Sequence, residues 1–326
     1  MLTTPMDVLY RFPVRKSKRQ KQAFRDEVQS YVTSLGYPCK TEKGSFGGRN
    51  LVIGDPNQAR YLITAHYDTC AWMPVANRLI PDRPFSYVMH QLWIACTLVI
   101  LPVLLGFLAA DGVIIGYLLS HDGAQLAEAG AQGALVFAAV FLPLFLLSYL
   151  MTYIGPENKN NANNNTSGVV TLLEIARSLP RNQRHKVCFV LFDLNEAGLL
   201  GSSAYRKAHK QATDHQIIVD LSCVGDGDDI LLIPTRQLKE DVPKLRRLYK
   251  CCGYFGQKSV LVQEKDLSLY PSDHRNFPYA VSVSAFHKGK KGHYTDRIHT
   301  TKDTVLEITN VNILRAAIIS MVAAAQ

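Results

Sequence analysis

Two histidines and several acidic residues stand in this 326-residue sequence where they could bind a metal ion. His66 and Asp68 end an apolar segment, Glu196 follows another apolar segment, and His299 lies in the polar stretch "DRIHTTKDT". Imidazole nitrogens and carboxylate oxygens are ligands that zinc prefers. Taken singly, each residue has a structural explanation, such as a core histidine for His66 or a helix N-terminal charge for Glu196. Taken together, they indicate a zinc site.

Apolar segments that alternate with amphipathic ones predict the fold that would bring these residues together. Strands are predicted at residues 61–68, 186–193, 216–225, 229–235 and 281–286, and helices at residues 16–35, 167–179, 198–209, 241–249 and from 311 onward. This alternation predicts an α/β fold with a mixed, mostly parallel sheet and helices on both faces. Ligand groups in such sheets gather at the carboxyl ends of the strands, where we expect His66, Asp193 and Asp220.

Two long apolar segments interrupt the α/β pattern. Residues 92–110 and 131–154 contain no charged residue, and Tyr149 and Tyr153 near the end of the second segment are suited to a membrane interface. At about 1.5 Å per residue, each segment can cross a hydrocarbon core of about 30 Å. We therefore predict a transmembrane hairpin at residues 88–155, inserted between residues 1–87 and 156–326 of one domain. Two buried core helices are the alternative.

The distribution of charge predicts the orientation in the membrane. The connector at residues 111–130 carries Asp111, Asp122 and Glu128 but no Lys or Arg, whereas basic residues flank the outer ends and crowd into residues 11–25. This asymmetry predicts an integral membrane protein with two spans and a cytoplasmic soluble domain. The net charge of +9 does not indicate a nucleic-acid partner, because no aromatic platform or DNA-reading motif accompanies the basic segment. The seven cysteines form no CxxC pair, which favours a reducing compartment.

Four sequence blocks resemble those of a known family. "AHYDT", "NNNTSGVVTLLEIAR", "FDLNEAGLLGS" and "RIHTTKDT" occur in this order, and Asp220 lies on a predicted strand between the last two. Over about residues 16–326 the chain is similar to the co-catalytic zinc aminopeptidases of the MH clan, metallopeptidase family 28. That family also includes glutaminyl cyclases and the non-catalytic ectodomain of nicastrin. The resemblance implies the zinc-aminopeptidase fold and removal of N-terminal residues from peptides, with zinc activating water.

The resemblance also implies a role for each site residue. His66 and Asp220 match ligands of the first zinc ion, and Asp68 matches the acid that orients the His66 imidazole. Glu196 and His299 match ligands of the second zinc ion. The block "YPSDHRNF" is also family-like and implies substrate-pocket positions at Tyr270, Asp273 and His274.

Two positions depart from the family pattern. Asn164 stands where the family has an Asp shared by both zinc ions, and Asn195 stands where it has the Glu that serves as general base. An amide offers one neutral carbonyl oxygen, so it cannot replace a bridging carboxylate, and it has no usable pKa for proton transfer. Asp193, predicted on the same strand face as Asn195, is the nearby carboxylate that could substitute. One or two zinc ions, with reduced occupancy, are therefore expected.

Two functions stay open on this evidence. The first is a membrane-embedded zinc aminopeptidase that hydrolyses peptides. The second is an inactive pseudopeptidase that binds a peptide or a membrane-protein partner through the same fold, and the pair Asn164 and Asn195 favours it. The abundant asparagines of residues 158–165 are interpreted partly as turn residues that cap and tolerate left-handed backbone. A transporter is not favoured, because neither span carries a charge.

Overall fold

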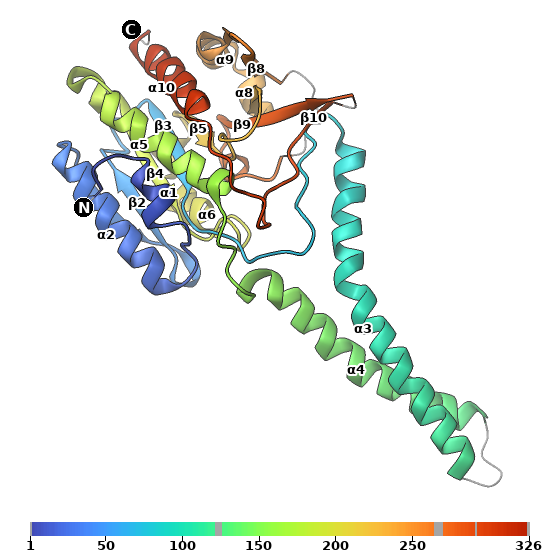
Figure 1. Ribbon diagram of the computed structural model, residues 1–326. Coiled ribbons are helices and arrows are strands. Elements are labelled where there is room, and N and C mark those ends of the chain that lie inside the picture. Colours follow the sequence, from blue (N-terminus) through green and yellow to red (C-terminus); the bar gives the residue numbers. More distant parts are fainter. Residues whose placement is uncertain (1, 121–125, 264–269, 291, 325–326) are drawn as a thin grey trace. The chain divides into compact units, whose positions relative to one another are not determined.

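The computed structural model describes residues 2–120, 126–263, 270–290 and 292–324 (Figure 1). Its residues divide into two compact units. One unit comprises Met1–Tyr87 and Glu157–Gln326, and the other comprises Val88–Pro156. Each unit is described separately below.

A ten-stranded mixed sheet forms the centre of the first unit, in the order β1-β2-β4-β3-β5-β9-β6-β8-β7 with β10 paired to β9. The central strands β4, β3, β5 and β9 are parallel, whereas β1, β2 and β7 pair antiparallel with their neighbours. The strands are β1 (Cys39–Lys43), β2 (Arg49–Ile53), β3 (Tyr61–His66), β4 (Val187–Phe192), β5 (Ile217–Leu221), β6 (Asp229–Pro234), β7 (Gly253–Phe255), β8 (Lys258–Val262), β9 (Ala280–Gly289) and β10 (Gly292–Tyr294).

Helices cover both faces of this sheet. Successive strand residues point to opposite faces, so Ile63 and Ala65 of β3 join one apolar cluster and Leu62 joins another. The first cluster contains residues of α1, α2, α5 and α10, and the second contains Tyr205 of α6. The α-helices of this unit are α1 (Asp7–Arg11), α2 (Lys18–Ser34), α5 (Gly168–Ser178), α6 (Leu200–Ala208), α7 (Lys210–Thr213), α8 (Arg236–Glu240), α9 (Val242–Leu248) and α10 (Ile308–Ala323). The predicted fold class is confirmed.

Short 3₁₀ helices supplement these elements. They are η1 (Ser45–Gly47), η3 (Arg181–Lys186), η4 (Tyr249–Cys251) and η5 (Asp273–Asn276), together with the π-helical stretch η2 (Ala162–Ser167). The strand predicted at residues 216–225 is shorter than expected and ends at Leu221. Cys223 adopts a left-handed backbone with φ of 56°, and its N–H donates to Asn165 Oδ1, so the chain turns out of the strand there.

The second unit consists of two long apolar helices, α3 (Pro84–Ser120) and α4 (Leu126–Ile154). Both are long and apolar enough to cross a membrane. The phenyl rings of Phe107 and Phe137 pack 4.8 Å apart, and a Cβ at Gly106 would approach the Phe137 ring to 2.9 Å, so a larger residue there would force this ring to shift. Most of their described apolar side chains are not buried, unlike those of a core helix.

The connector predicted at residues 111–130 is too long. Asp111 lies within α3 and Glu128 within α4, while Asp122 lies outside the described residues. The helix continues past Asp111 because the residues that follow are again apolar and include no proline. One charge therefore ended the predicted span but does not end the helix.

Candidate functional site

The candidate site lies at the carboxyl ends of β3, β4 and β5. His66 is the last residue of β3, and Asp220 is the penultimate residue of β5. The parallel register pairs Thr64 with Asp220, and Thr64 Oγ1 donates a hydrogen bond to Asp220 Oδ1 at 3.0 Å. Both His66 and Asp220 are buried. The sheet thus brings the predicted strand-end residues to one edge.

Asp68 links the His66 imidazole to the loop after β4. His66 Nδ1 lies 3.4 Å from Asp68 Oδ1, and the Asp68 carboxylate accepts the backbone N–H groups of Asn195 and Glu196, each at 3.1 Å. Burial lowers the pKa of His66, but the hydrogen bond and charge of Asp68 outweigh it and raise the pKa to about 9. The two side chains therefore form a buried ion pair.

The side chains of Asn164, Glu196 and His299 also meet. Asn164 Nδ2 donates to Glu196 Oε1 at 2.8 Å, and Glu196 Oε2 lies 3.5 Å from His299 Nε2. The carbonyl oxygen of the Asn164 amide instead accepts a hydrogen bond from the Cys223 thiol at 3.3 Å. Asn164 thus faces the acid as a donor, with its only metal-binding atom turned toward a thiol.

Asn195 has a similar contact with a second acid. Its Nδ2 donates to Asp273 Oδ2 at 2.9 Å, and the Ser202 hydroxyl donates to the other oxygen of Asp273 at 2.5 Å. Asp273 is fully buried, and burial together with the charge of Asp220 raises its pKa to about 7. Both amide positions at the centre of the site therefore donate to carboxyl groups.

The predicted pocket residues lie around Asp220. The backbone N–H of His274 donates to Asp220 Oδ2 at 3.3 Å, and the Ser272 hydroxyl donates to the same oxygen. Tyr270 donates to the backbone oxygen of Ser222 at 3.2 Å. Burial, followed by the charge of Arg275, lowers the pKa of His274 to about 3, so this imidazole is neutral.

The prediction that Asp193 could replace the missing base at Asn195 is wrong. Its carboxylate pairs with Lys21 Nζ at 2.5 Å and accepts the Arg49 N–H at 3.0 Å. The strand ends at Phe192, and Leu194 has a φ of +56°, so strand alternation does not extend to Asn195. Asp193 holds α2 against the sheet, and the acid that contacts the Asn195 side chain is Asp273.

Replacing Lys21 with Met is expected to lower the free energy of unfolding by about 3 kcal/mol, because it leaves the buried Asp193 carboxylate without its cation. Chemical denaturation of the detergent-solubilised protein measures this loss. Lys40→Met removes an exposed partner of Glu42 and should change stability by less than about 1 kcal/mol. Equal effects of the two substitutions would contradict the buried role of Lys21.

The asparagine-rich stretch is a buried scaffold and not the left-handed turn that was predicted in part. Across residues 158–165, all of which the structure describes, no asparagine has a positive φ. Asn165 Nδ2 donates to the backbone oxygens of His66 and Leu221, which joins the ends of β3 and β5. Asn163 Oδ1 accepts the N–H of Gly225 at 2.8 Å. These amides satisfy strand-end backbone groups at the site.

Two site residues escaped the sequence prediction. The Cys70 thiol lies beside the Glu196 carboxylate and the His299 ring, with the ligand atoms of all three residues within 4.8 Å of one another. Asp303 accepts the backbone N–H groups of Asn163 and Asn164 at 2.7 and 3.0 Å. Both residues lie in or directly after the quoted blocks, as in "AHYDTC" and "RIHTTKDT", which was the available signal.

The residues present do not fit a pair of zinc ions with a shared ligand. Asn164 offers no carboxylate to be shared, and its amide donates to Glu196. The donors Glu196 and His299, with the Cys70 thiol next to them, do fit a single zinc ion.

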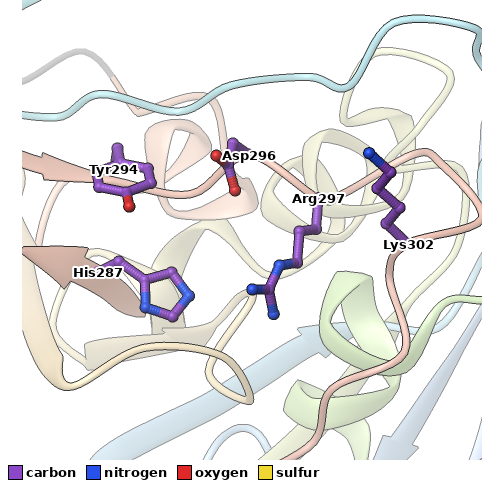
Figure 2. Close-up of a pocket in the computed structure, with 5 residues that line it drawn as sticks. All are labelled: His287, Tyr294, Asp296, Arg297 and Lys302. Atoms are coloured by element: carbon purple, nitrogen blue, oxygen red, sulfur yellow. The ribbon is translucent and has the colours of Figure 1, made fainter. Parts of the chain in front are cut away.

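A pocket with a volume of about 260 Å³ borders the loop that carries His299. It is lined by His287, Tyr294, Asp296, Arg297 and Lys302. Figure 2 shows Arg297 between Lys302 and the rings of Tyr294 and His287. Buried Asp226 binds His287 Nε2 at 3.0 Å and lies 3.3 Å from the Arg297 guanidinium, which holds both side chains at the pocket wall.

The profile of Peptidase family M28 matches residues 151–323, just over half of the chain. No curated protein sequence matches the chain.

Among solved structures, glutaminyl cyclase from Porphyromonas gingivalis superposes with a TM-score of 0.58 at 16% identity, covering 98% of this chain and 96% of its own. The LapA aminopeptidase of Legionella pneumophila gives a TM-score of 0.55 at 12% identity, and the alignment covers 98% of this chain and 68% of LapA. A leucine aminopeptidase precursor from Bacteroides thetaiotaomicron gives a TM-score of 0.54 at 14% identity, and the alignment covers 96% of this chain and 92% of the precursor. At these identities the structures show a shared fold.

Proposed function

Because the chain belongs to peptidase family M28 and carries amides at two central acid positions, we propose that it is a membrane-anchored pseudopeptidase. It binds the amino-terminal part of a peptide and does not hydrolyse it by a two-zinc mechanism. The observation that carries this proposal is the orientation of the two amides. Asn164 donates to Glu196 at 2.8 Å and Asn195 donates to Asp273 at 2.9 Å, so amide N–H groups hold the acidic centre together.

Both substitutions remove something that two-metal hydrolysis needs. Neighbouring carboxylates repel one another unless a cation or a proton lies between them. Here an amide stands next to each acid, so no cation or proton is needed between them. A general base must also accept and return a proton, a contribution of about 10²- to 10⁴-fold, and the Asn195 amide cannot do so. The centre is therefore stable without a metal pair and lacks a base at the expected position.

The charges around the site suit a short peptide or a peptide end. Glu196 is half-buried and its carboxylate attracts the cationic amine of a peptide N-terminus. Arg297 and Lys302 supply cations at the neighbouring pocket for a carboxylate of the same peptide (Figure 2). Nucleic acid is not a proposed partner.

The two long helices support a membrane location for this function. α3 and α4 are each long and apolar enough to span a bilayer, and they form a hairpin in sequence. The acidic residues Asp111 and Glu128 lie toward the connector between the two spans, whereas basic residues precede the first span. The soluble unit is therefore proposed to face the cytoplasm. Peptides of membrane origin, or a membrane-protein partner, are the proposed ligands.

One experiment tests the proposal on the full-length protein in detergent micelles. Fluorescence anisotropy should detect binding of a C-terminally labelled peptide with a free N-terminus, and N-acetylation should weaken it. Leucine p-nitroanilide with added zinc should show no turnover. The double variant Asn164→Asp, Asn195→Glu should hydrolyse the anilide at least about 100-fold faster than the uncatalysed background. Zinc-dependent turnover by the wild type that is lost in Glu196→Gln would overturn the proposal.

A second candidate is a single-metal aminopeptidase in which Asp273 serves as the base. The pKa of Asp273, raised to about 7 by burial and by Asp220, is the observation that favours it, since a base works best when its pKa lies near the working pH. In that case wild-type turnover should be measurable and should disappear in Asp273→Asn. The same anilide assay separates the two candidates.

A further inference from the structure

We propose that Cys70, Glu196 and His299 form a site for a single zinc ion, in which the Cys70 thiolate replaces the carboxylate that the chain lacks at Asn164. The three ligand atoms lie within 4.8 Å of one another. His299 Nε2 and Glu196 Oε2 are 3.5 Å apart, close to the roughly 3.3 Å that separates two ligand atoms around tetrahedral zinc. The site shares Glu196 with the proposed peptide-binding function, on which the inference rests, and adds Cys70 and a metal ion to it.

Asn164 positions a ligand and is not one itself. Its Nδ2 holds Glu196 Oε1 at 2.8 Å, and the other carboxylate oxygen, Oε2, faces His299 Nε2. The carbonyl oxygen of the same amide faces the Cys223 thiol. An anionic ligand must therefore come from elsewhere, and Cys70 supplies it. A thiolate and a carboxylate together balance the double charge of one zinc ion.

Backbone hydrogen bonds fix the segment that carries Cys70 against the one that carries His299. The Met73 N–H donates to the His299 carbonyl at 2.9 Å. Asn158 also bridges the two segments, because its N–H donates to the Cys70 carbonyl at 3.5 Å and its side-chain Nδ2 donates to the Thr300 carbonyl at 3.1 Å. His299 itself has a φ of +67°, a left-handed conformation that is unfavourable for a residue with a Cβ. Conformations of this kind persist where the surroundings enforce them, and they concentrate at functional sites.

The ligand types select the ion. Sulfur, imidazole nitrogen and carboxylate oxygen suit zinc, whereas magnesium and calcium prefer oxygen ligands alone. Binding replaces the S–H bond of Cys70 by a zinc–sulfur bond, and the proton leaves to solvent. Three protein ligands leave a fourth position open, which a water molecule or a peptide amine can take.

Cobalt(II) titration of the full-length protein tests the site without an activity assay. A thiolate-to-cobalt charge-transfer band in the near ultraviolet is expected, and mass spectrometry should find about one zinc ion per chain. Cys70→Ser should abolish the band and weaken zinc binding by more than about 100-fold. Loss of a residue that only supports a metal ligand typically weakens binding by about 10- to 100-fold, so the larger effect identifies Cys70 as a ligand. Cys39→Ser, at a half-buried cysteine on β1, is the matched control and should keep both signals.

A second variant guards against misfolding as the explanation. Cys70→Asp supplies a carboxylate in place of the thiolate, so it should lose the cobalt band and retain zinc. A band that persists in Cys70→Ser, or a wild type that binds neither ion, overturns the site. Peptide anisotropy measured on the same samples shows whether the proposed function fails with the site or stands without it.

Discussion

Replacing Asn164 with Asp is expected to lower the free energy of unfolding by about 3 kcal/mol when EDTA is present. Asn164 Nδ2 donates to Glu196 Oε1 at 2.8 Å, and Asn164 is 4% exposed. The substitution exchanges a hydrogen bond to a charged acceptor for a contact between two carboxylates in a buried site. Chemical denaturation of the detergent-solubilised variant measures the loss, and added zinc should reverse it, because a cation between the two acids removes their repulsion.

Asn164→Ala is the matched control for this prediction. It removes the hydrogen bond without adding a charge, so it should lose about 1.5 kcal/mol in EDTA and should gain no more from zinc than the wild type does. Asn164→Asp with wild-type stability in EDTA would show that the amide does not hold Glu196 in place.

The strands that build the site could be predicted because their signal is local. β3 and β4 are buried apolar runs in the sequence, and each is directly followed by polar residues. The order of the blocks around His66, Glu196 and His299 then sufficed to place those residues at one sheet edge. The edge strand β1 was missed because "CKTEK" is mostly exposed and carries charges instead of an apolar run.

Side-chain partners could not be predicted in the same way, because they depend on contacts between distant parts of the chain. Asp193 forms an ion pair with Lys21, which is 172 residues away in the sequence, and the Asn195 side chain donates to Asp273, which is 78 residues away. Strand periodicity says which face a residue occupies, but it stops where the strand stops. The turn at Leu194 is therefore what made Asp193 a wrong choice and left Asp273 unrecognised as the partner of Asn195.

Raising the pH from about 4 to about 7 is expected to remove a stabilising contribution of Asp273. The pKa of Asp273 is 3.8 in its ordinary state and about 7 in the folded protein, because burial and the nearby Asp220 disfavour its charge. Between these values the unfolded chain has released the proton and the folded protein has kept it. Since Asp273 is then protonated in the folded state and ionised in the unfolded state, its contribution to stability falls as the pH rises and becomes level above about 7.

Asp273→Asn removes this titration, so the stability of the variant should lack the fall that Asp273 causes between about pH 4 and 7. The free energy of unfolding of the variant minus that of the wild type is measured at pH 4 and at pH 8. This difference is expected to be larger at pH 8 by up to about 4 kcal/mol. Unfolding midpoints measured across this range check the result, with Asp26→Asn as the control at an exposed carboxylate. Asp303 has its pKa raised to about 7 by burial, so part of the slope should remain. If stability changes with pH in the same way in Asp273→Asn and in the wild type, Asp273 is already ionised at pH 4. Asp273 could then not serve as a base with a pKa near neutral pH.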